Sequence, residues 1–281
     1  MLSHVINMLN QNHFNDRLTQ KGITLSNFRR YRSFIVSTFL VFGVFVNAYA
    51  NNTTSLNVFV DSSYPPYMYK VKGVEAGGLY PKILKEIAHK TGHNFNIKAY
   101  PWARALSQGA LGKGAIAGAY KNDERLKIYD FSNPIYQEKL VLFVNINNQF
   151  DFEDISDLKG KVIGVNRGWS YGQDFDAARE EGVFNVNVRN NPKENFKMLA
   201  LGRIDSLILD QLSGESYLQL MGLEDKIVML PKPFSINNAY LILNKKLNKR
   251  IFLNEFNTAL EQLRSNGRYK HFVQSFIKEA F

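Results

Sequence analysis

Short apolar runs rich in β-branched residues alternate with segments of helical periodicity along most of this 281-residue chain. Residues 56–60 read LNVFV and predict a strand. Residues 81–92 read PKILKEIAHKTG and predict a helix that begins at Pro81 and ends at Gly92. This alternation is typical of βαβ units, in which largely parallel strands are flanked by helices. The sequence therefore predicts an α/β fold.

The predicted strands form two sets, each interleaved with helices. Strands are predicted in the first set at residues 56–60, 95–99 and 115–119, and in the second at 161–165, 186–188 and 206–209. Further helices are predicted at residues 102–111, 173–181, 192–201 and 249–280. The carboxyl ends of the strands in both sets would face a shared cleft, where open α/β sheets bind their ligands.

Two longer apolar runs connect these sets. Residues 140–146 (LVLFVNI) lie between them, and residues 239–243 (AYLIL) follow the second. A hinge with a double crossover requires two such runs. We therefore expect a first lobe in residues 51–142, a second lobe in 143–237, and a return to the first lobe with C-terminal helices in 238–281.

The N-terminus has the order of a secretory signal. Residues 29–32 (RRYR) precede an uncharged apolar run at 34–46, and Ala-Tyr-Ala at 48–50 places small residues where signal peptidase reads them. The run is shorter than the roughly 20 residues that a membrane span prefers, and an uncleaved anchor is the alternative. We expect residues 1–50 to be a signal peptide with a long leader, cleaved after Ala50, which would export the protein to the periplasm. Where translation starts within the leader stays open.

The charge and the absence of cysteine exclude several classes of function. Residues 1–50 hold five of the 35 basic and one of the 25 acidic residues, so the remainder carries a net charge of only +6. These charges are scattered and form no nucleic-acid motif, so no nucleic-acid partner is expected. The lack of cysteine excludes a disulfide framework, a thiol nucleophile and a cysteine zinc site. His89 and His93 are separated by Gly92 and are interpreted as surface residues, so we expect no metal and no cofactor.

One segment resembles a known family in residue type and spacing. Residues 118–136 read GAYKNDERLKIYDFSNPIY. They resemble the G-x6-R…DFS-x-P-x-Y segment of bacterial type II solute-binding proteins, the family 3 proteins of polar amino-acid ABC transporters. The strand-then-Asp opening at 61–67, DLKGKVIGV at 157–165, and the Gly-Arg-Ile-Asp turn with its strand at 202–210 support the resemblance, which covers residues 55–281.

The resemblance implies a fold, a function and a partner. The fold would be the two-lobed type II periplasmic binding protein fold, with a mostly parallel sheet flanked by helices in each lobe and a two-strand hinge. The protein would bind a small polar solute, an amino acid or related carboxylate, by lobe closure. It would then deliver the solute to the membrane permease of an ABC importer. We expect a monomer, no catalytic residues and no enzymatic activity.

Three charged residues are candidates for binding the charged groups of the solute. Arg125 offers a planar fork of donors that matches a carboxylate, and by resemblance it aligns with the arginine that grips the ligand's α-carboxylate. The alternative is a solvated arginine in a helical turn. By resemblance, Asp210 aligns with the acidic partner of the ligand's α-ammonium, and capping of the following helix is the alternative. Asp61 is a weaker candidate of the same kind, or an ordinary turn residue.

Three further candidates would bring the backbone close to a ligand. Gly118, expected at the end of its strand, would let a ligand approach backbone groups closely, unless it is a simple turn glycine. Gly168 and Ser170 precede a helix expected to begin near Gln173, whose exposed N–H groups favour an anionic group. Ordinary N-capping of that helix by Ser170 is the alternative, and both roles are compatible.

Aromatic residues at predicted strand ends and loops could wall the site, where they would sandwich an apolar stem or stack on a cation. They are Tyr64, Tyr67, Trp102, Tyr120 and Trp169. Core packing is the alternative for each of them. Arg104, two residues after Trp102, either reaches the cleft or lies on the surface. Tyr120 and Trp169 stand where the family often has small hydroxyl residues. An unusual amino acid, a small peptide or another small anion or zwitterion therefore stays open as the ligand.

Two other functions fit the same scaffold. A periplasmic enzyme, such as a dehydratase of a small carboxylic acid, would need a general acid or base in the cleft. The sequence offers Asp61, Asp210 and Glu75 but no histidine in a cleft-forming segment. A sensory module that reports ligand occupancy to a membrane receptor is the other alternative.

Overall fold

The computed structural model describes residues 55–280. The predicted signal peptide and its cleavage site at Ala50 lie outside this range. Among the helices of the described range, none has the length and apolar character needed to cross a membrane.

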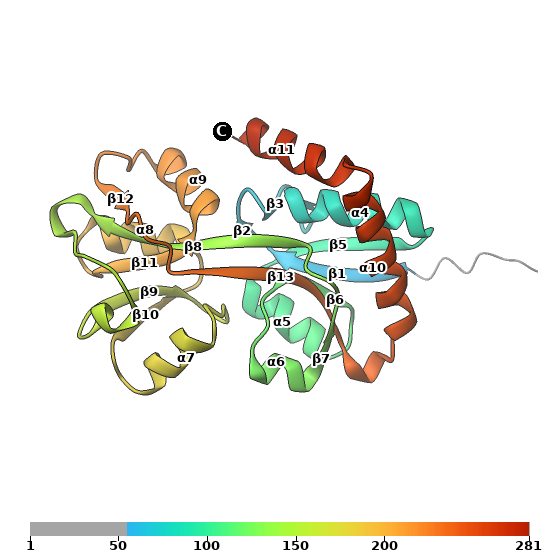
Figure 1. Ribbon diagram of the computed structural model, residues 1–281, viewed down its shortest axis with the longest axis horizontal. Coiled ribbons are helices and arrows are strands. Elements are labelled where there is room, and N and C mark those ends of the chain that lie inside the picture. The colour runs from blue at the N-terminus through green and yellow to red at the C-terminus, as the bar shows by residue number, and fades with distance from the viewer. Residues whose placement is uncertain (1–54, 281) are drawn as a thin grey trace, which may run out of the picture. The chain divides into compact units, whose positions relative to one another are not determined.

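A mixed sheet of ten strands runs through the described residues (Figure 1), in the order β10-β9-β11-β8-β13-β6-β1-β5, with β12 on β8 and β7 on β13. Its strands are β1 (Ser55–Asp61), β5 (Asn94–Tyr100), β6 (Ala115–Ala119), β7 (Tyr129–Phe131), β8 (Tyr136–Asn145), β9 (Val162–Asn166), β10 (Asn185–Arg189), β11 (Ser206–Asp210), β12 (Ile227–Met229) and β13 (Ser235–Asn244). A second sheet has three short strands, β2 (Ser63–Tyr64), β3 (Met68–Lys70) and β4 (Ala76–Gly77).

Helices flank the large sheet. They are α4 (Leu79–Thr91), α5 (Trp102–Ala110), α6 (Asp123–Ile128), α7 (Gln173–Glu180), α8 (Pro192–Ala200), α9 (Gln211–Met221), α10 (Arg250–Ser265) and α11 (Arg268–Ala280). Strand β1 pairs in parallel with β5 and β6, and β9 pairs in parallel with β10 and β11. The predicted α/β fold with two largely parallel sets of strands is confirmed.

Two long strands join these sets. The first half of β8 pairs antiparallel with β13, from Tyr136 with Ala239 to Leu140 with Ser235. Beyond this stretch β8 pairs with β11, and the second half of β13 pairs with β6. Figure 1 shows β8 and β13 side by side, each running from one set of strands to the other. The two-strand connection is therefore present, and the lobe boundaries at 142/143 and 237/238 remain predictions.

The helix and strand ends differ from the predictions in a few places. Helix α4 begins at Leu79, before Pro81, because Gly78 holds the N-cap position. It ends at Gly92, whose φ of 71° is the left-handed conformation that favours glycine. The C-terminal helical stretch is divided into α10 and α11 at Gly267.

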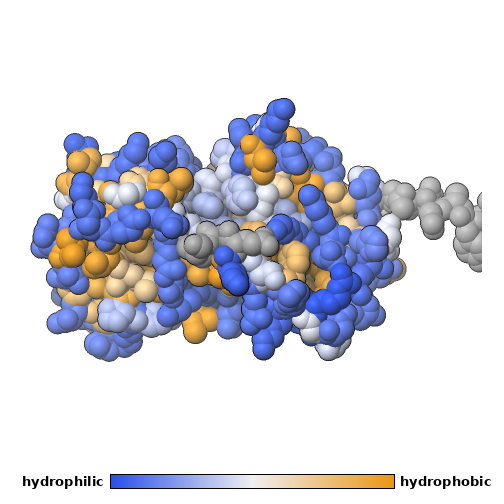
Figure 2. All heavy atoms as spheres, turned by 90° about the horizontal axis from the view of Figure 1, so that it is seen from above, coloured by the Kyte–Doolittle hydropathy of each residue, from blue (hydrophilic) through white to orange (hydrophobic). Residues whose placement is uncertain are grey.

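The apolar stripe of α4 explains how the helices pack on the sheet. Leu79, Ile83, Leu84 and Ile87 are each at most 1% exposed, because their helical spacing turns one face of the helix toward the strands. Each such side chain contributes about 1.5–3 kcal/mol when it leaves water. Figure 2 shows hydrophilic side chains over much of the visible face, with smaller apolar groups between them, as expected for a surface that faces water.

Candidate functional site

The chain segments that follow several parallel strands meet at one place. Asp61 is the last residue of β1, Trp102 begins α5 soon after β5, and Tyr120 directly follows β6. Trp169 and Ser170 come from the loop between β9 and α7. Because parallel strands end at the same edge of a sheet, residues distant in sequence come together there.

These segments line a cavity of about 20 Å³. It is lined by Asp61, Tyr64, Met68, Trp102, Gly118, Tyr120, Arg125, Trp169 and Ser170. All of these except Met68 are residues that the sequence predicted for ligand binding. A cavity of this size has room for about one water molecule, so any larger ligand requires the walls to move apart.

Arg125 brings a buried cation to the cavity. Its backbone N–H donates to the side chain of Asn122, which caps α6. The guanidinium donates from Nη1 to the carbonyl oxygen of Tyr120 at 2.9 Å and from Nη2 to that of Gly168 at 3.2 Å. Arg125 is only 8% exposed, and burial lowers its pKa. In residues 55–280, no carboxylate oxygen lies within 4.0 Å of its nitrogens. A guanidinium has more donors than these two bonds use, so it can bind an anionic group.

Asp61 brings a buried carboxylate to the same cavity. It accepts hydrogen bonds from the backbone N–H of Ser63 at 2.8 Å, from the Ser63 hydroxyl at 3.0 Å and from Nε1 of Trp169 at 3.0 Å. Burial raises the pKa of Asp61 to about 6, although these bonds oppose the shift. The cavity therefore has both a cationic and an acidic group in its wall.

Contacts between the two sets of strands hold the cleft closed. Trp169 packs edge-on against Tyr64, with ring centroids 4.7 Å apart, in addition to its bond to Asp61. The indole N–H of Trp102 donates to the carbonyl of Gly168 at 2.9 Å. Trp169 and its loop thus occupy space that a ligand would need. A groove of about 960 Å³, lined by residues of α5, α6 and α7, shares Arg125, Trp169 and Ser170 with the cavity and therefore adjoins it.

The indole hydrogen bond of Trp169 can be tested by replacing Trp169 with phenylalanine. We expect the ligand-free variant to open more often, because a hydrogen bond to a charged group contributes about 1.5–3 kcal/mol. Small-angle X-ray scattering should then give a larger radius of gyration than for the unaltered protein. Tyr171→Phe is the matched control, since the Tyr171 hydroxyl accepts a bond from Asn166 within the second set of strands alone. Equal radii for Trp169→Phe and the unaltered protein would show that this bond does not hold the cleft closed.

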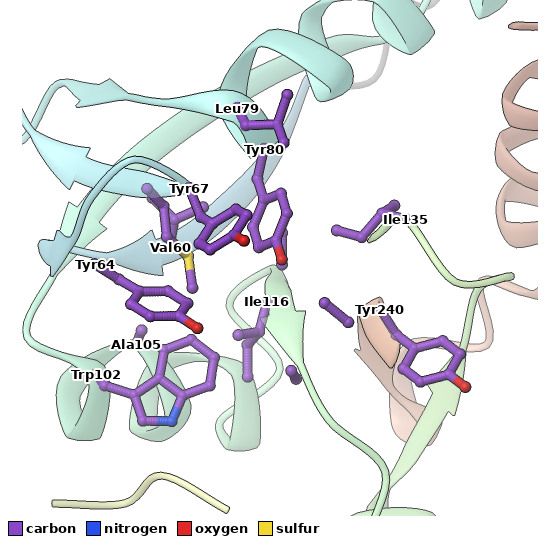
Figure 3. Close-up of a cluster of buried hydrophobic side chains, with 14 of the residues drawn as sticks. Val60, Tyr64, Tyr67, Leu79, Tyr80, Trp102, Ala105, Ile116, Ile135 and Tyr240 are labelled. Atoms are coloured by element: carbon purple, nitrogen blue, oxygen red, sulfur yellow. The ribbon is translucent and has the colours of Figure 1, made fainter. Parts of the chain in front are cut away.

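Glu138 is a functional candidate that the sequence reasoning missed. It lies on β8, is 0% exposed, and accepts hydrogen bonds from the hydroxyls of Tyr64, Tyr80 and Tyr120. Figure 3 shows the rings of Tyr64 and Tyr80 turned with their hydroxyls toward a common region of the interior. Burial, followed by the negative charge of Asp210, raises the pKa of Glu138 to about 8. The sequence contained a signal for this position. Glu138 lies two residues before Leu140, which is buried, and side chains two residues apart in a strand share one face of the sheet.

Asp210 and Tyr67 lie next to this region but are not among the residues that line the cavity. Asp210 caps α9 by accepting a hydrogen bond from the N–H of Ser213 at 3.1 Å, so the capping role that the sequence left open is present. Burial raises the pKa of Asp210 to about 6. Tyr67 is 1% exposed and stacks on Tyr80, with centroids 5.4 Å apart.

The other predicted residues have different positions. Gly168 contributes its carbonyl oxygen to Arg125 and Trp102 instead of lining the cavity. Arg104 is exposed and lies over the ring of Tyr100, 4.4 Å from its centroid. Ser170 lines the cavity, but the expectation that it could cap α7 is wrong, because Gly172 holds the N-cap position without a side-chain bond.

The histidine pair has no metal-site geometry in the described residues. Nε2 of His93 lies 2.7 Å from a carboxylate oxygen of Glu255. Over residues 55–280, no group of three or more His, Cys, Asp or Glu side chains could hold a metal ion.

Comparison with known proteins identifies the family. Residues 56–279 match the family of bacterial extracellular solute-binding proteins, family 3. The chain belongs to this family. The L-cystine-binding protein TcyJ of Escherichia coli is 23% identical over 245 residues, which cover 83% of this chain and 89% of TcyJ. A probable histidine-binding protein of Campylobacter jejuni is 24% identical over 239 residues, which cover 82% of this chain and 88% of that protein.

A solved structure of an ancestral arginine-binding protein bound to arginine has the same fold as this family 3 solute-binding protein. The TM-score is 0.68 at 24% identity, and the match covers 79% of this chain and 97% of that one. The two-lobed fold expected from the sequence is therefore confirmed.

Proposed function

We propose that this family 3 protein binds a small zwitterionic solute of the amino-acid type and delivers it to the permease of an ABC importer. The observation that carries the proposal is that Arg125, a buried cation with no carboxylate oxygen within 4.0 Å in residues 55–280, lines the same cavity as buried Asp61. Burying an unpaired charge is costly, and a ligand carboxylate would offset that cost at Arg125. The ligand's ammonium would be attracted to the acidic wall. The amino acids named for the two relatives support this ligand class.

The cavity must expand to hold such a solute. We propose that the loop bearing Trp169 withdraws when the lobes part and closes again over the ligand. The ligand's apolar stem would then contact the faces of Tyr64, Trp102 and Trp169. The proposed contact residues are those predicted from the sequence that line the cavity: Asp61, Tyr64, Trp102, Gly118, Tyr120, Arg125, Trp169 and Ser170. Asp210, Tyr67, Gly168 and Arg104 would contact it only after rearrangement.

We further propose that binding is reversible and leaves the solute unchanged. Asp61 lines the cavity, and its pKa of about 6 would suit proton transfer. However, three hydrogen bonds donated to its carboxylate favour the ionised form and fix its position. This arrangement suits a fixed acceptor better than a proton donor.

The arginine-rich, apolar, Ala-Tyr-Ala order of the N-terminus supports export to the periplasm and cleavage after Ala50.

The proposal is tested with protein that has been unfolded, stripped of ligand and refolded. Thermal unfolding and tryptophan fluorescence are measured against each L-amino acid. We expect one or a few compounds to raise the unfolding midpoint in a concentration-dependent way, since a ligand at a hundred times its Kd stabilises by about 2.7 kcal/mol. Fluorescence should change as well, because both Trp102 and Trp169 line the cavity. If no compound shifts either signal, the amino-acid class is wrong.

A further inference from the structure

Glu138 lies behind one wall of the cavity, where the hydroxyls of three tyrosines surround it. Tyr64 comes from β2, Tyr80 from α4, and Tyr120 from the segment after β6. The hydroxyl of Tyr80 donates to Oε1 of Glu138, and the hydroxyls of Tyr64 and Tyr120 both donate to Oε2. Both carboxylate oxygens are therefore occupied, and Glu138 itself does not line the cavity.

This arrangement determines whether the hydroxyls of Tyr64 and Tyr120 donate or accept hydrogen bonds at the cavity. A hydroxyl has one hydrogen, and an ionised carboxylate only accepts hydrogen bonds. With their hydrogens directed at Glu138, Tyr64 and Tyr120 can offer only oxygen lone pairs elsewhere. Both residues line the cavity together with Asp61. When Glu138 is ionised, this part of the wall therefore consists of hydrogen-bond acceptors with a negative charge behind them.

We propose that Glu138 is a specificity-determining residue that acts through Tyr64 and Tyr120. By orienting their hydroxyls, it makes this wall select an amino acid whose side chain carries a cation over a neutral compound of the same shape. The inference rests on the proposed function, in which Arg125 holds the carboxylate of that amino acid. It adds to that function the chemical class of the ligand's side chain, which carries a positive charge.

The protonation of Glu138 should be coupled to binding. The groups that face it are the hydroxyls of Tyr64, Tyr80 and Tyr120, and the carboxylate of Asp210, Tyr67 and Tyr136 also interact with it electrostatically. Burial, followed by the charge of Asp210, raises the pKa of Glu138 to about 8. A protonated carboxyl must donate its own hydrogen to a tyrosine oxygen, and that tyrosine must then turn its O–H away. A bound cation favours the ionised form and lowers the pKa of Glu138. Binding therefore releases protons below pH 8, and affinity for a cationic ligand rises with pH until about pH 8.

Glu138→Gln tests the proposal, with L-arginine and its neutral isostere L-citrulline as probes. The side-chain amide has N–H donors that need an acceptor, so at least one tyrosine must accept and turn its O–H elsewhere. We expect the unaltered protein to bind L-arginine at least about tenfold more tightly, and the variant to lose most of this preference. Calorimetry at pH 7 in buffers of different ionisation enthalpy should show proton release for the unaltered protein and markedly less for Glu138→Gln, in which only residues such as Asp61 can still release protons.

Two further variants keep the test decisive. Tyr120→Phe removes one acceptor while Glu138 stays, so it should reduce the preference for L-arginine even if Glu138→Gln fails to fold. Glu153→Gln changes a carboxylate that is 80% exposed and should change neither the preference nor the proton release. An unchanged arginine-to-citrulline ratio in Glu138→Gln or Tyr120→Phe overturns the inference, as does a protein that binds only neutral or acidic amino acids. A protein that binds no amino acid overturns the proposed function as well.

Discussion

Replacing Arg125 with alanine should weaken binding of the amino acid that stabilises the unaltered protein by a hundredfold or more. The guanidinium is buried, held by the carbonyl oxygens of Tyr120 and Gly168, and has donors left for a ligand carboxylate. Truncating one partner of a buried, hydrogen-bonded charge pair costs roughly 2–5 kcal/mol, and each 1.4 kcal/mol corresponds to about tenfold in Kd. Isothermal titration calorimetry on the ligand-stripped variant measures the loss.

Arg104→Ala is the matched control for this experiment. Arg104 is also an arginine near Trp102, but its side chain is exposed and stacks on Tyr100. We expect its removal to change the Kd by less than about twofold, in line with the small effects of surface substitutions. If both arginine variants have the same Kd, or if Arg125→Ala has the Kd of the unaltered protein, Arg125 does not bind the ligand's carboxylate.

Gly118→Ala should damage both stability and binding. Gly118 has a φ of +87°, and an added Cβ would lie 2.5 Å from Cε of Met68 and 3.1 Å from Cε2 of Tyr80. The left-handed conformation costs a non-glycine residue about 1–2 kcal/mol, and crowding adds to this. Met68 would have to move, and both Met68 and Gly118 line the cavity. We expect a loss of about 2–4 kcal/mol in the free energy of unfolding and at least about tenfold weaker binding.

Gly202→Ala separates the two causes. Gly202 has a φ of +64°, but an added Cβ would meet nothing within 4 Å. This variant therefore measures backbone strain alone, and its ligand affinity should be unchanged. Urea unfolding gives the stability of both variants, and calorimetry gives their affinities. Equal stability losses and unchanged affinity in both would show that the space around Gly118 is irrelevant to the site.

Much of the fold could be predicted because local signals agree with the tertiary structure. The strand predicted at 115–119 is β6 itself, bounded by glycine before it and polar residues after it. The two connecting strands were predicted too short. Their first halves, from Tyr136 in β8 and Ser235 in β13, are mostly polar, and only the continuous apolar halves gave a clear signal. Glu138 was missed for this reason.

The residues of the candidate site could be predicted only where they follow the end of a predicted parallel strand. Asp61 and Tyr120 follow the ends of β1 and β6, so topology brings them together. Met68 could not be foreseen, because it reaches the cavity from β3, a strand of the separate small sheet. Arg104 illustrates another limit: residues two apart on a helix face different directions, so Trp102 lines the cavity and Arg104 does not.

We expect the protein to hold a small solute reversibly and to release it unchanged. Equilibrium dialysis of the ligand-stripped protein against the amino acid that stabilises it, followed by denaturation and mass spectrometry of the released compound, tests this directly. We expect close to one molecule of the same compound per protein chain, released intact after prolonged incubation. Recovery of a chemically altered compound would indicate an enzyme, and failure to retain any amino acid would contradict the binding function.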